Sequence, residues 1–204
     1  MSACTLNQHL IERAVEFHGH WCPGLAIGLR AGEYALNHLG RAADEEIVAV
    51  VETDMCGVDA IQVLTGCTFG KGNLLFRDHG KMAFSFYRRS DGQGVRLVFD
   101  RARLDQAGDD FAELNQKWLR NELDPDGEAR LMEMRQERTR WIMTAPLEEV
   151  FTAKTPDFAM PRPARILTSL TCDQCGESVM ESRTRRLEGR TLCIACFEAR
   201  DKWL

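Results

Sequence analysis

The spacing of hydrophobic residues along the first hundred positions predicts helices first and a sheet afterwards. Apolar residues recur at helical spacing over 5–16, and a second helix is expected from about 24 to 39. Residues 47–51 are continuously apolar and mostly β-branched, which predicts a central strand buried on both faces. Apolar residues then alternate along 82–86 and 95–99 around an Asp-Gly-Gln-Gly turn, so this stretch predicts a β-hairpin.

The rest of the chain predicts three further helices and a linker. A short helix should follow Cys56, and longer helices are expected over about 109–122 and 125–144, the first with Phe111, Leu114, Trp118 and Leu119 as its apolar stripe. Residues 155–165 hold three prolines and few large apolar groups, as linkers do. The sequence therefore predicts an α+β fold in three parts, which are a core (1–154), a linker (155–170) and a small terminal unit (171–204).

Three of the expected helices have recognisable first residues. Thr5 is a candidate cap for the first helix. Cys22 and Asp124 each precede a proline, Pro23 and Pro125, and proline suits the first helical position because its missing N–H costs nothing there. We therefore expect Cys22 at a helix N-terminus, where the helix dipole favours a thiolate.

One face of the second expected helix has no side chains. Gly24, Gly28 and Gly32 recur every four residues, so another backbone or a ligand can come close to this face. Packing against another helix or a sheet is the commoner cause of such a pattern, and we expect it here.

Composition and charge narrow the class of protein. The chain has 204 residues, a net charge of −5 and a pI near 5.6, which argues against nucleic acid as the main partner. No apolar run approaches the roughly 20 residues that span a bilayer, and the N-terminus shows no secretory signal. We expect a cytoplasmic protein with no membrane partner, whose eight cysteines are metal ligands or reactive thiols rather than disulfides.

Four of these cysteines lie in the terminal unit at zinc-finger spacing. Cys172 and Cys175 form one CxxC pair, and Cys193 and Cys196 form a second pair 17 residues further on. Four thiolates at this spacing predict a closed, structural Zn²⁺ site. A hairpin over 179–192 and a helix from Phe197 to Trp203 would give a treble-clef finger. Basic and acidic residues balance at six each from 172 onward, which favours a docking or dimer contact over nucleic-acid binding.

A second group of metal-binding residue types lies in the core. His18, His20 and Cys22 fall within five residues, and Cys56 and Cys67 lie in two further glycine-containing segments. Imidazole and thiolate together suit zinc or a redox metal, and an open site of this kind keeps a position for substrate. We expect His20, Cys22 and Cys56 to hold a core metal, zinc or iron, with His18 or Cys67 completing or orienting the site.

The glycine-rich loop over 66–73 has two interpretations. It fails the Walker A pattern because only three residues separate Gly66 from Gly70 and Gly72 follows Lys71. Its backbone N–H groups and Lys71 could still contact an anion. It is equally possible that the loop is only a tight connection between two structural elements.

Four motifs in order over about residues 9–150 resemble the FmdE family, the E-type subunits of formylmethanofuran dehydrogenase. They are F-H-G-H-W-C-P-G, C-G-V-D-A-I-Q, T-G-C-T-F-G-K-G-N-L and G-K-M-A-F, and the tail resembles a finger that some members carry. The resemblance implies an α+β homodimer connected with the molybdenum or tungsten oxidoreductase that reduces carbon dioxide onto methanofuran in methanogenesis. No segment resembles a molybdopterin-binding domain. The functional positions that the resemblance implies are His18, His20, Cys22, Cys56, Asp59, Cys67 and Lys71.

Three functions remain open from the sequence. The first is a metal-binding protein of one-carbon or redox metabolism, alone or in a larger redox enzyme complex, whose cleft binds a small anionic or one-carbon substrate. Asp59 and Lys71 would then support the ligands or contact the anion. The second is a dimeric adaptor that holds only structural zinc. The third is thiol redox chemistry among Cys22, Cys56 and Cys67.

Overall fold

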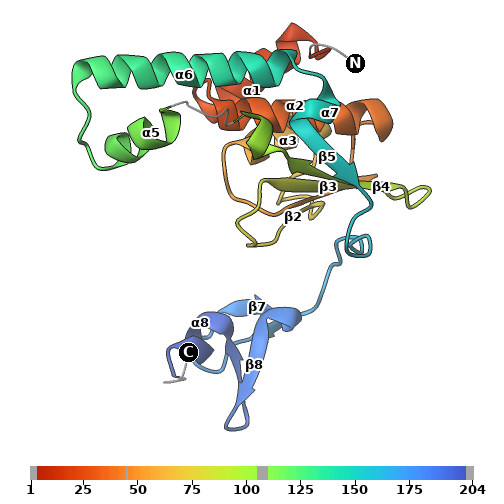
Figure 1. Cartoon of the computed structure of the whole chain (residues 1–204). Helices are drawn as coiled ribbons and strands as arrows, with labels where there is room; N and C mark the ends of the chain where they lie inside the picture. The colour runs from red at the N-terminus through yellow and green to blue at the C-terminus, as the bar shows by residue number, and fades with distance from the viewer. Residues whose placement is uncertain (1–3, 45, 105–109, 201–204) are drawn as a thin grey trace. The chain divides into compact units, whose positions relative to one another are not determined.

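The chain folds into two compact units. The computed structural model describes residues 4–44, 46–104 and 110–200. One unit is Met1–Pro163 and the other is Ala164–Leu204, and each is described by itself (Figure 1). Over the described ranges, no helix is long and apolar enough to cross a bilayer.

The first unit contains a five-stranded mixed sheet in the order β2-β1-β3-β4-β5. β1 and β2 are parallel, and the other neighbouring strands are antiparallel. The strands are β1 (Ile47–Val51), β2 (Leu74–Phe76), β3 (Ala83–Arg88), β4 (Gly94–Phe99) and β5 (Phe151–Lys154).

The described helices of this unit lie mainly on one side of the sheet (Figure 1). Alanines and Ile27 of the second helix pack with Val51, Phe84 and Leu97 in the main core. The helices are α1 (Gln8–His18), α2 (Pro23–His38), α3 (Gly57–Thr65), α4 (Arg101–Leu104), α5 (Phe111–Leu119), α6 (Pro125–Thr144) and α7 (Leu147–Val150). The predicted α+β class is confirmed.

The strongest strand predictions are confirmed. All five residues of β1 are buried, as expected for a central strand. β3 and β4 form the predicted hairpin, and the register pairs Phe84 with Leu97 and Phe86 with Val95 on one face. β2 and β5 were not predicted, because three or four residues are too short to show a period.

Two predicted helix caps are confirmed and one is wrong. Cys22 precedes α2, and its sulfur accepts a hydrogen bond from the Leu25 N–H at 3.3 Å. Asp124 caps α6 by accepting from the Gly127 N–H at 2.8 Å. Thr5 does not cap α1. Asn7 does, while the Thr5 N–H and hydroxyl donate to the buried Glu33 carboxylate at 2.6 and 2.7 Å.

The glycine face of α2 packs against α3, as expected. A Cβ atom at Gly28 would overlap the backbone of Gly57, the first residue of α3. A Cβ at Gly32 would lie 2.6 Å from the Leu64 side chain. The two helix backbones are therefore held closer than any larger residue would permit.

Part of the predicted linker belongs to the first unit. Residues 156–161, called the strap here, lie on the sheet face opposite the helices. Tyr87 donates its hydroxyl to the Phe158 carbonyl at 2.8 Å, and the Arg89 guanidinium donates to the Pro161 carbonyl at 2.8 Å. The small cluster that the strap covers contains Val48, Val50, Leu75, Tyr87, Phe158 and Met160. The prolines prevent this segment from pairing as a regular strand. Its apolar residues nevertheless cover the sheet face that the helices leave uncovered.

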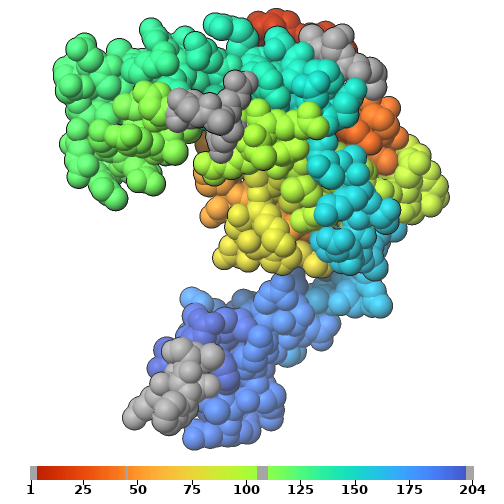
Figure 2. Space-filling model, in the orientation of Figure 1, coloured from red at the N-terminus to blue at the C-terminus, as the bar shows by residue number. Residues whose placement is uncertain are grey.

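The expected apolar stripe of the helix near 109–122 is half-buried at Phe111 and Leu114 and exposed at its other two positions. α5 has no buried residue, and Trp118 and Leu119 are 44% and 67% exposed. Residue 109, where this helix was expected to begin, lies outside the described residues. Figure 2 shows α5 and the first turns of α6 as a green lobe, and α5 packs mainly against α6. The Arg135 guanidinium covers the Trp118 ring at 4.4 Å.

The second unit is small and built around its cysteines. The predicted hairpin begins at residue 184 rather than 179, because residues 178–180 pair with 169–171 instead. Glu188 and Gly189 adopt left-handed conformations at its turn, as expected. The final helix begins at Ile194 rather than at the predicted Phe197 and ends at Glu198, and residues 201–204 lie outside the described residues. The elements are β6 (Ser169–Thr171), β7 (Ser178–Met180), η1 (Glu181–Arg183), β8 (Thr184–Leu187), β9 (Arg190–Cys193) and α8 (Ile194–Glu198).

Candidate functional site

Three of the predicted core ligands converge where α1 ends and α2 begins. His18 closes α1, Gly19 reverses the chain in a left-handed conformation, and His20 and Cys22 follow before α2. One ligand atom from each of the two imidazoles and the thiol lies within 4.8 Å of the others. We call His18, His20 and Cys22 the core ligand group.

A carboxylate from α3 orients the first imidazole of this group. His18 Nδ1 donates to Asp59 Oδ2 at 2.7 Å, which leaves Nε2 as the free ring nitrogen. His18 Nε2 lies 3.8 Å from Cys22 Sγ, and the two histidine rings are 4.5 Å apart at their centroids. Histidines that bind metals commonly donate their other ring N–H to a carboxylate in this way, and that bond fixes the tautomer.

The core ligand group fits a tetrahedral metal ion. Zinc–nitrogen and zinc–sulfur bonds of about 2.0 and 2.3 Å place two ligand atoms roughly 3.5 Å apart, close to the separation of His18 Nε2 and Cys22 Sγ. Three protein ligands leave one position for water, a fourth protein group or substrate. Mixed imidazole and thiolate ligands also suit iron.

Cys56 lies beside this group at the start of α3. A Cβ atom at Gly24 would lie 3.5 Å from Cys56 Sγ and 3.8 Å from Cys22 Sγ, so both sulfurs face the same glycine. Burial and the neighbouring Cys22 thiol raise the pKa of Cys56. Cys56 lies outside the set of ligand atoms within 4.8 Å of one another, but its closeness to Cys22 makes it a candidate for the fourth position.

The structure does not bring Cys67 and Lys71 to this group. Cys67 is fully buried beyond the other end of α3, where its thiol donates to the Ile47 carbonyl at 3.4 Å. Burial raises the pKa of this thiol. Lys71 belongs to the same loop and lies near Gly66. Since α3 has nine residues and is about 13 Å long, these two residues are a helix length away from Cys56.

A large cleft opens directly beside the core ligand group. Its volume is 720 Å³, and its wall includes Pro23 and Gly24 of α2 and residues 53–55, which precede Cys56. Its basic residues are Lys81, Arg101 and Arg138. Sequence reasoning missed all three because they come from distant segments, although Lys81 lies in the G-K-M-A-F motif.

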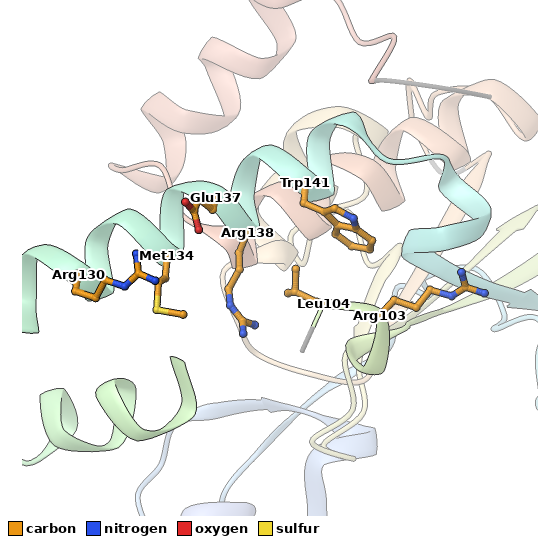
Figure 3. Close-up of a pocket in the computed structure, with 7 residues that line it drawn as sticks. All are labelled: Arg103, Leu104, Arg130, Met134, Glu137, Arg138 and Trp141. Carbon is orange, nitrogen blue, oxygen red and sulfur yellow. The ribbon is translucent and has the colours of Figure 1, made fainter. Parts of the chain in front are cut away.

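A second, smaller cavity of 240 Å³ lies between α4 and α6 (Figure 3). It shares Leu104 and Arg138 with the large cleft. Two of its arginines already have acidic neighbours, since Arg103 lies 3.3 Å from Asp100 and Arg130 lies 3.4 Å from Glu133. Among its described wall residues this cavity has Glu137 beside three arginines and no lysine, whereas the large cleft includes Lys81.

The four tail cysteines form a closed cluster. One sulfur from each of Cys172, Cys175, Cys193 and Cys196 lies within 4.8 Å of the other three. Backbone N–H groups, chiefly that of Cys175, lower the pKa of Cys172 to about 6, and the Cys193 N–H donates to this sulfur at 3.3 Å. Tetrahedral zinc needs sulfurs about 3.8 Å apart, so the cluster fits a structural zinc ion.

Comparisons with known proteins agree with both units. The family model described as FmdE, molybdenum formylmethanofuran dehydrogenase operon, matches residues 17–152. The model described as prokaryotic dksA/traR C4-type zinc finger matches residues 165–202.

Two proteins are similar over nearly the whole chain. A probable S-adenosyl-L-methionine-binding protein from Archaeoglobus fulgidus is 34% identical over 195 residues, which cover 92% of this chain and 52% of that protein. The chain thus spans about half the length of this relative. The crystal structure of an FmdE-like protein of the tungsten formylmethanofuran dehydrogenase type, from Syntrophus aciditrophicus, has the same fold. Its TM-score is 0.61 and its identity 23%, and the match covers 98% of this chain and 99% of that one. The chain therefore belongs to the FmdE family and carries a C4-type zinc finger after its FmdE domain.

Proposed function

We propose that the FmdE domain holds a zinc or iron ion at the core ligand group, beside a cleft that receives the substrate. One observation carries this proposal. Asp59 accepts from His18 Nδ1 at 2.7 Å, so that Nε2 lies 3.8 Å from Cys22 Sγ with His20 next to both. A carboxylate, a histidine and a second ligand in this relation are typical of metal centres.

Such a site favours substrates that can approach an open metal position. His18, His20 and Cys22 would hold the ion, which would supply Lewis-acid polarisation of an oxygen of substrate or water. The chain's own contribution is to hold the imidazole of His18 in one tautomer through Asp59 and to place the cleft against Gly24. The sequence predicts a small anionic or one-carbon substrate, and the basic residues of the cleft support an anion.

S-adenosyl-L-methionine is a second candidate ligand for the same cleft. The observation in its favour is that the A. fulgidus relative, which is 34% identical to this chain, is described as a probable binder of this compound. Calorimetric titration of the purified protein with this compound tests it. Binding that the cleft variant Asp54→Ala weakens would support the assignment, and an absence of heat at millimolar ligand would contradict it.

Metal analysis of anaerobically purified protein tests the main proposal. We expect two ions per chain in the wild type and one in His20→Ala and Cys22→Ala, because each removes one of three core ligands. Cys67→Ala is the matched control, since this thiol is buried away from the site and its loss should leave two ions. Wild-type protein with a single zinc would instead support the dimeric adaptor. Sedimentation velocity measures the predicted homodimer independently.

The role of Asp59 is tested by metal affinity rather than by metal count. Asp59→Asn should lower the affinity of the core site by about 10- to 100-fold, because the imidazole loses the carboxylate that orients it. Asp54→Asn is the control, since Asp54 lines the cleft but makes no hydrogen bond to His18. Competition with a chelator of known affinity measures both. Equal affinities in the two variants would contradict the orienting role.

A further inference from the structure

We propose that the large cleft binds an organic anion that carries a large apolar body, rather than a bare one-carbon anion. This inference rests on the proposed function, because it assigns a ligand class to the cleft beside the core metal. Three features of the cleft carry it, namely its volume, the apolar part of its wall and the sign of its charged residues.

The volume is too large for a one-carbon substrate alone. Cofactor and ligand pockets typically enclose about 300–1,000 Å³, and the cleft has 720 Å³. A water molecule takes up about 30 Å³ in the liquid, so formate, with three heavy atoms, would leave most of the cleft filled with water. A ligand that fills the cleft must therefore extend well beyond its reacting carbon.

The wall offers apolar contacts on several sides. Ile27 comes from the glycine-faced helix α2, Val98 and Phe99 from β4, and Met82 from the residue before β3. The remaining apolar residues are Pro23, Met55, Leu104 and Phe111. Apart from the buried Ile27, these side chains are partly or largely exposed to water, so burying a ligand's hydrocarbon against them is favourable.

The charged side chains that line the cleft favour a negatively charged ligand. Among the described residues of its wall, Lys81, Arg101 and Arg138 are basic and Asp54 is acidic. This balance is the reverse of the whole chain, whose net charge is −5, so the positive cleft is a local feature. Arg138 is held in place by its guanidinium, which stacks 3.7 Å over the Phe111 ring. Across the described ranges, Lys81 has no acidic side chain within ion-pair distance.

The cleft also leads to the candidate metal. Gly24 lines it, and a Cβ atom there would touch the sulfurs of both Cys22 and Cys56. The two cysteines do not line the cleft themselves, but they lie directly behind Gly24, which has no side chain. A ligand whose anionic group meets Lys81 or an arginine can thus present another part of its structure to the core site.

Isothermal titration of the zinc-loaded full chain tests this inference with simple probes. Acetate, butyrate and octanoate vary the apolar body, and octylamine keeps the octyl chain but reverses the charge. We expect affinity to rise with chain length and octanoate to bind at least ten-fold more tightly than acetate or octylamine. Octyl phosphate, run in parallel, shows whether phosphate or carboxylate is the preferred anionic group, and tight binding of either supports the class.

Two lysine variants locate the binding in the cleft. Lys81→Gln should weaken octanoate about five- to ten-fold, whereas Lys71→Gln, which changes a lysine of the distant loop, should leave it unchanged. Equal binding of octylamine and octanoate, a flat chain-length series, or no effect of Lys81→Gln would each overturn the inference.

Failure of the predicted ligand class and failure of the predicted core metal give different experimental results. Protein with two ions per chain that fails to bind octanoate overturns the ligand class alone. Protein with one ion that binds octanoate in a Lys81-dependent manner supports the ligand class and overturns the core metal. His20→Ala, which should lack the core ion, is expected to retain octanoate affinity within about three-fold because the cations and apolar wall are intact.

Discussion

At the residue scale, one buried ion pair fixes the chain where it enters the candidate site. Glu52 follows β1, and its two oxygens accept from the Arg96 guanidinium at 2.6 and 2.9 Å. His79 Nδ1 lies 3.1 Å from the same carboxylate. These hydrogen bonds, chiefly those of Arg96, lower the pKa of Glu52 from 4.5 to about 2. The pair sets the start of the loop that continues through the cleft wall to Cys56.

This ion pair predicts a pH dependence of stability with a definite sign. Because the pKa of Glu52 is depressed in the folded state, its contribution is complete above about pH 4.5 and is lost as the pH falls towards 2. The contribution is about 3 kcal/mol. Glu52→Gln should therefore lower the free energy of unfolding at pH 6, and the difference from wild type should shrink between pH 4.5 and 2. Urea unfolding at a series of pH values measures it.

An exposed carboxylate provides the matched control for this experiment. Glu113 lies 2.7 Å from Lys117 on the surface of α5, where ion pairs contribute little to stability. Glu113→Gln should leave the free energy of unfolding close to that of the wild type at each of these pH values. A Glu52→Gln difference that stayed constant down to pH 2 would contradict the role assigned to the carboxylate.

The sequence predicted the position of a site residue correctly where neighbouring residues in the chain determine it. Cys22 could be placed at a helix start because Pro23 follows it, and the structure puts it there. Cys67 could not be excluded in advance, since its spacing from Cys56 does not reveal that a whole helix separates them. Lys81, just before β3, and Arg138, in α6, line the same cleft only because the fold brings these distant segments together. No local sequence pattern could have predicted that these two residues line one cleft.

At the element scale, the contact between α2 and α3 holds the two halves of the candidate site together. Cys22 precedes α2, Cys56 precedes α3, and Gly28 meets Gly57 between the helices. Gly28→Ala should destabilise the protein by about 1–3 kcal/mol, because the added methyl group meets backbone that cannot move aside. This loss should exceed the gain in helix propensity from glycine to alanine, about 1 kcal/mol. Thermal or urea unfolding measures it.

The same substitution has a functional consequence that a control can isolate. Pushing α3 away from α2 separates Asp59 and Cys56 from the core ligand group, so Gly28→Ala should also lower the affinity for the core metal. Gly70→Ala is the control, since a Cβ atom there would meet no atom within 4 Å. It should leave stability and metal affinity unchanged. Equal stability of the two variants would contradict the close packing of α2 on α3.

The elements that could be predicted from the sequence are those whose hydrophobic pattern extends over many residues or whose ends carry a clear signal. β1, the β3–β4 hairpin and α6 each carry such a signal and are confirmed. β5 and the strap carry none, because their positions are set by the sheet edge and sheet face that they cover. The residues of the strap became part of the predicted linker, since prolines look the same in a free linker and in an extended segment packed on a sheet.

At the scale of the whole molecule, the two units differ in what stabilises them. The first has a core that joins α2, the sheet, α6 and α7. Among the described residues of the second, only Cys172 and Leu192 are buried, and Cys172 is itself one of the cluster sulfurs. A core this small cannot offset the conformational entropy of some 40 residues, so the second unit must depend on its metal.

Removal of the tail zinc should therefore unfold the second unit and leave the first folded. In Cys175→Ala, one of the four sulfurs is lost, and the amides of β9 and β7 should exchange with deuterium at the rate of an unfolded chain. Amides of β1 and β3, which lie in the core of the first unit, should stay protected as in the wild type. Hydrogen exchange read by mass spectrometry resolves the two sets in one sample. Cys67→Ser, a change of a non-ligand thiol, is the control for the loss of a cysteine. If β1 and β9 lost protection together in Cys175→Ala, the tail zinc would stabilise the whole chain, and the two units could not be treated as independently folded.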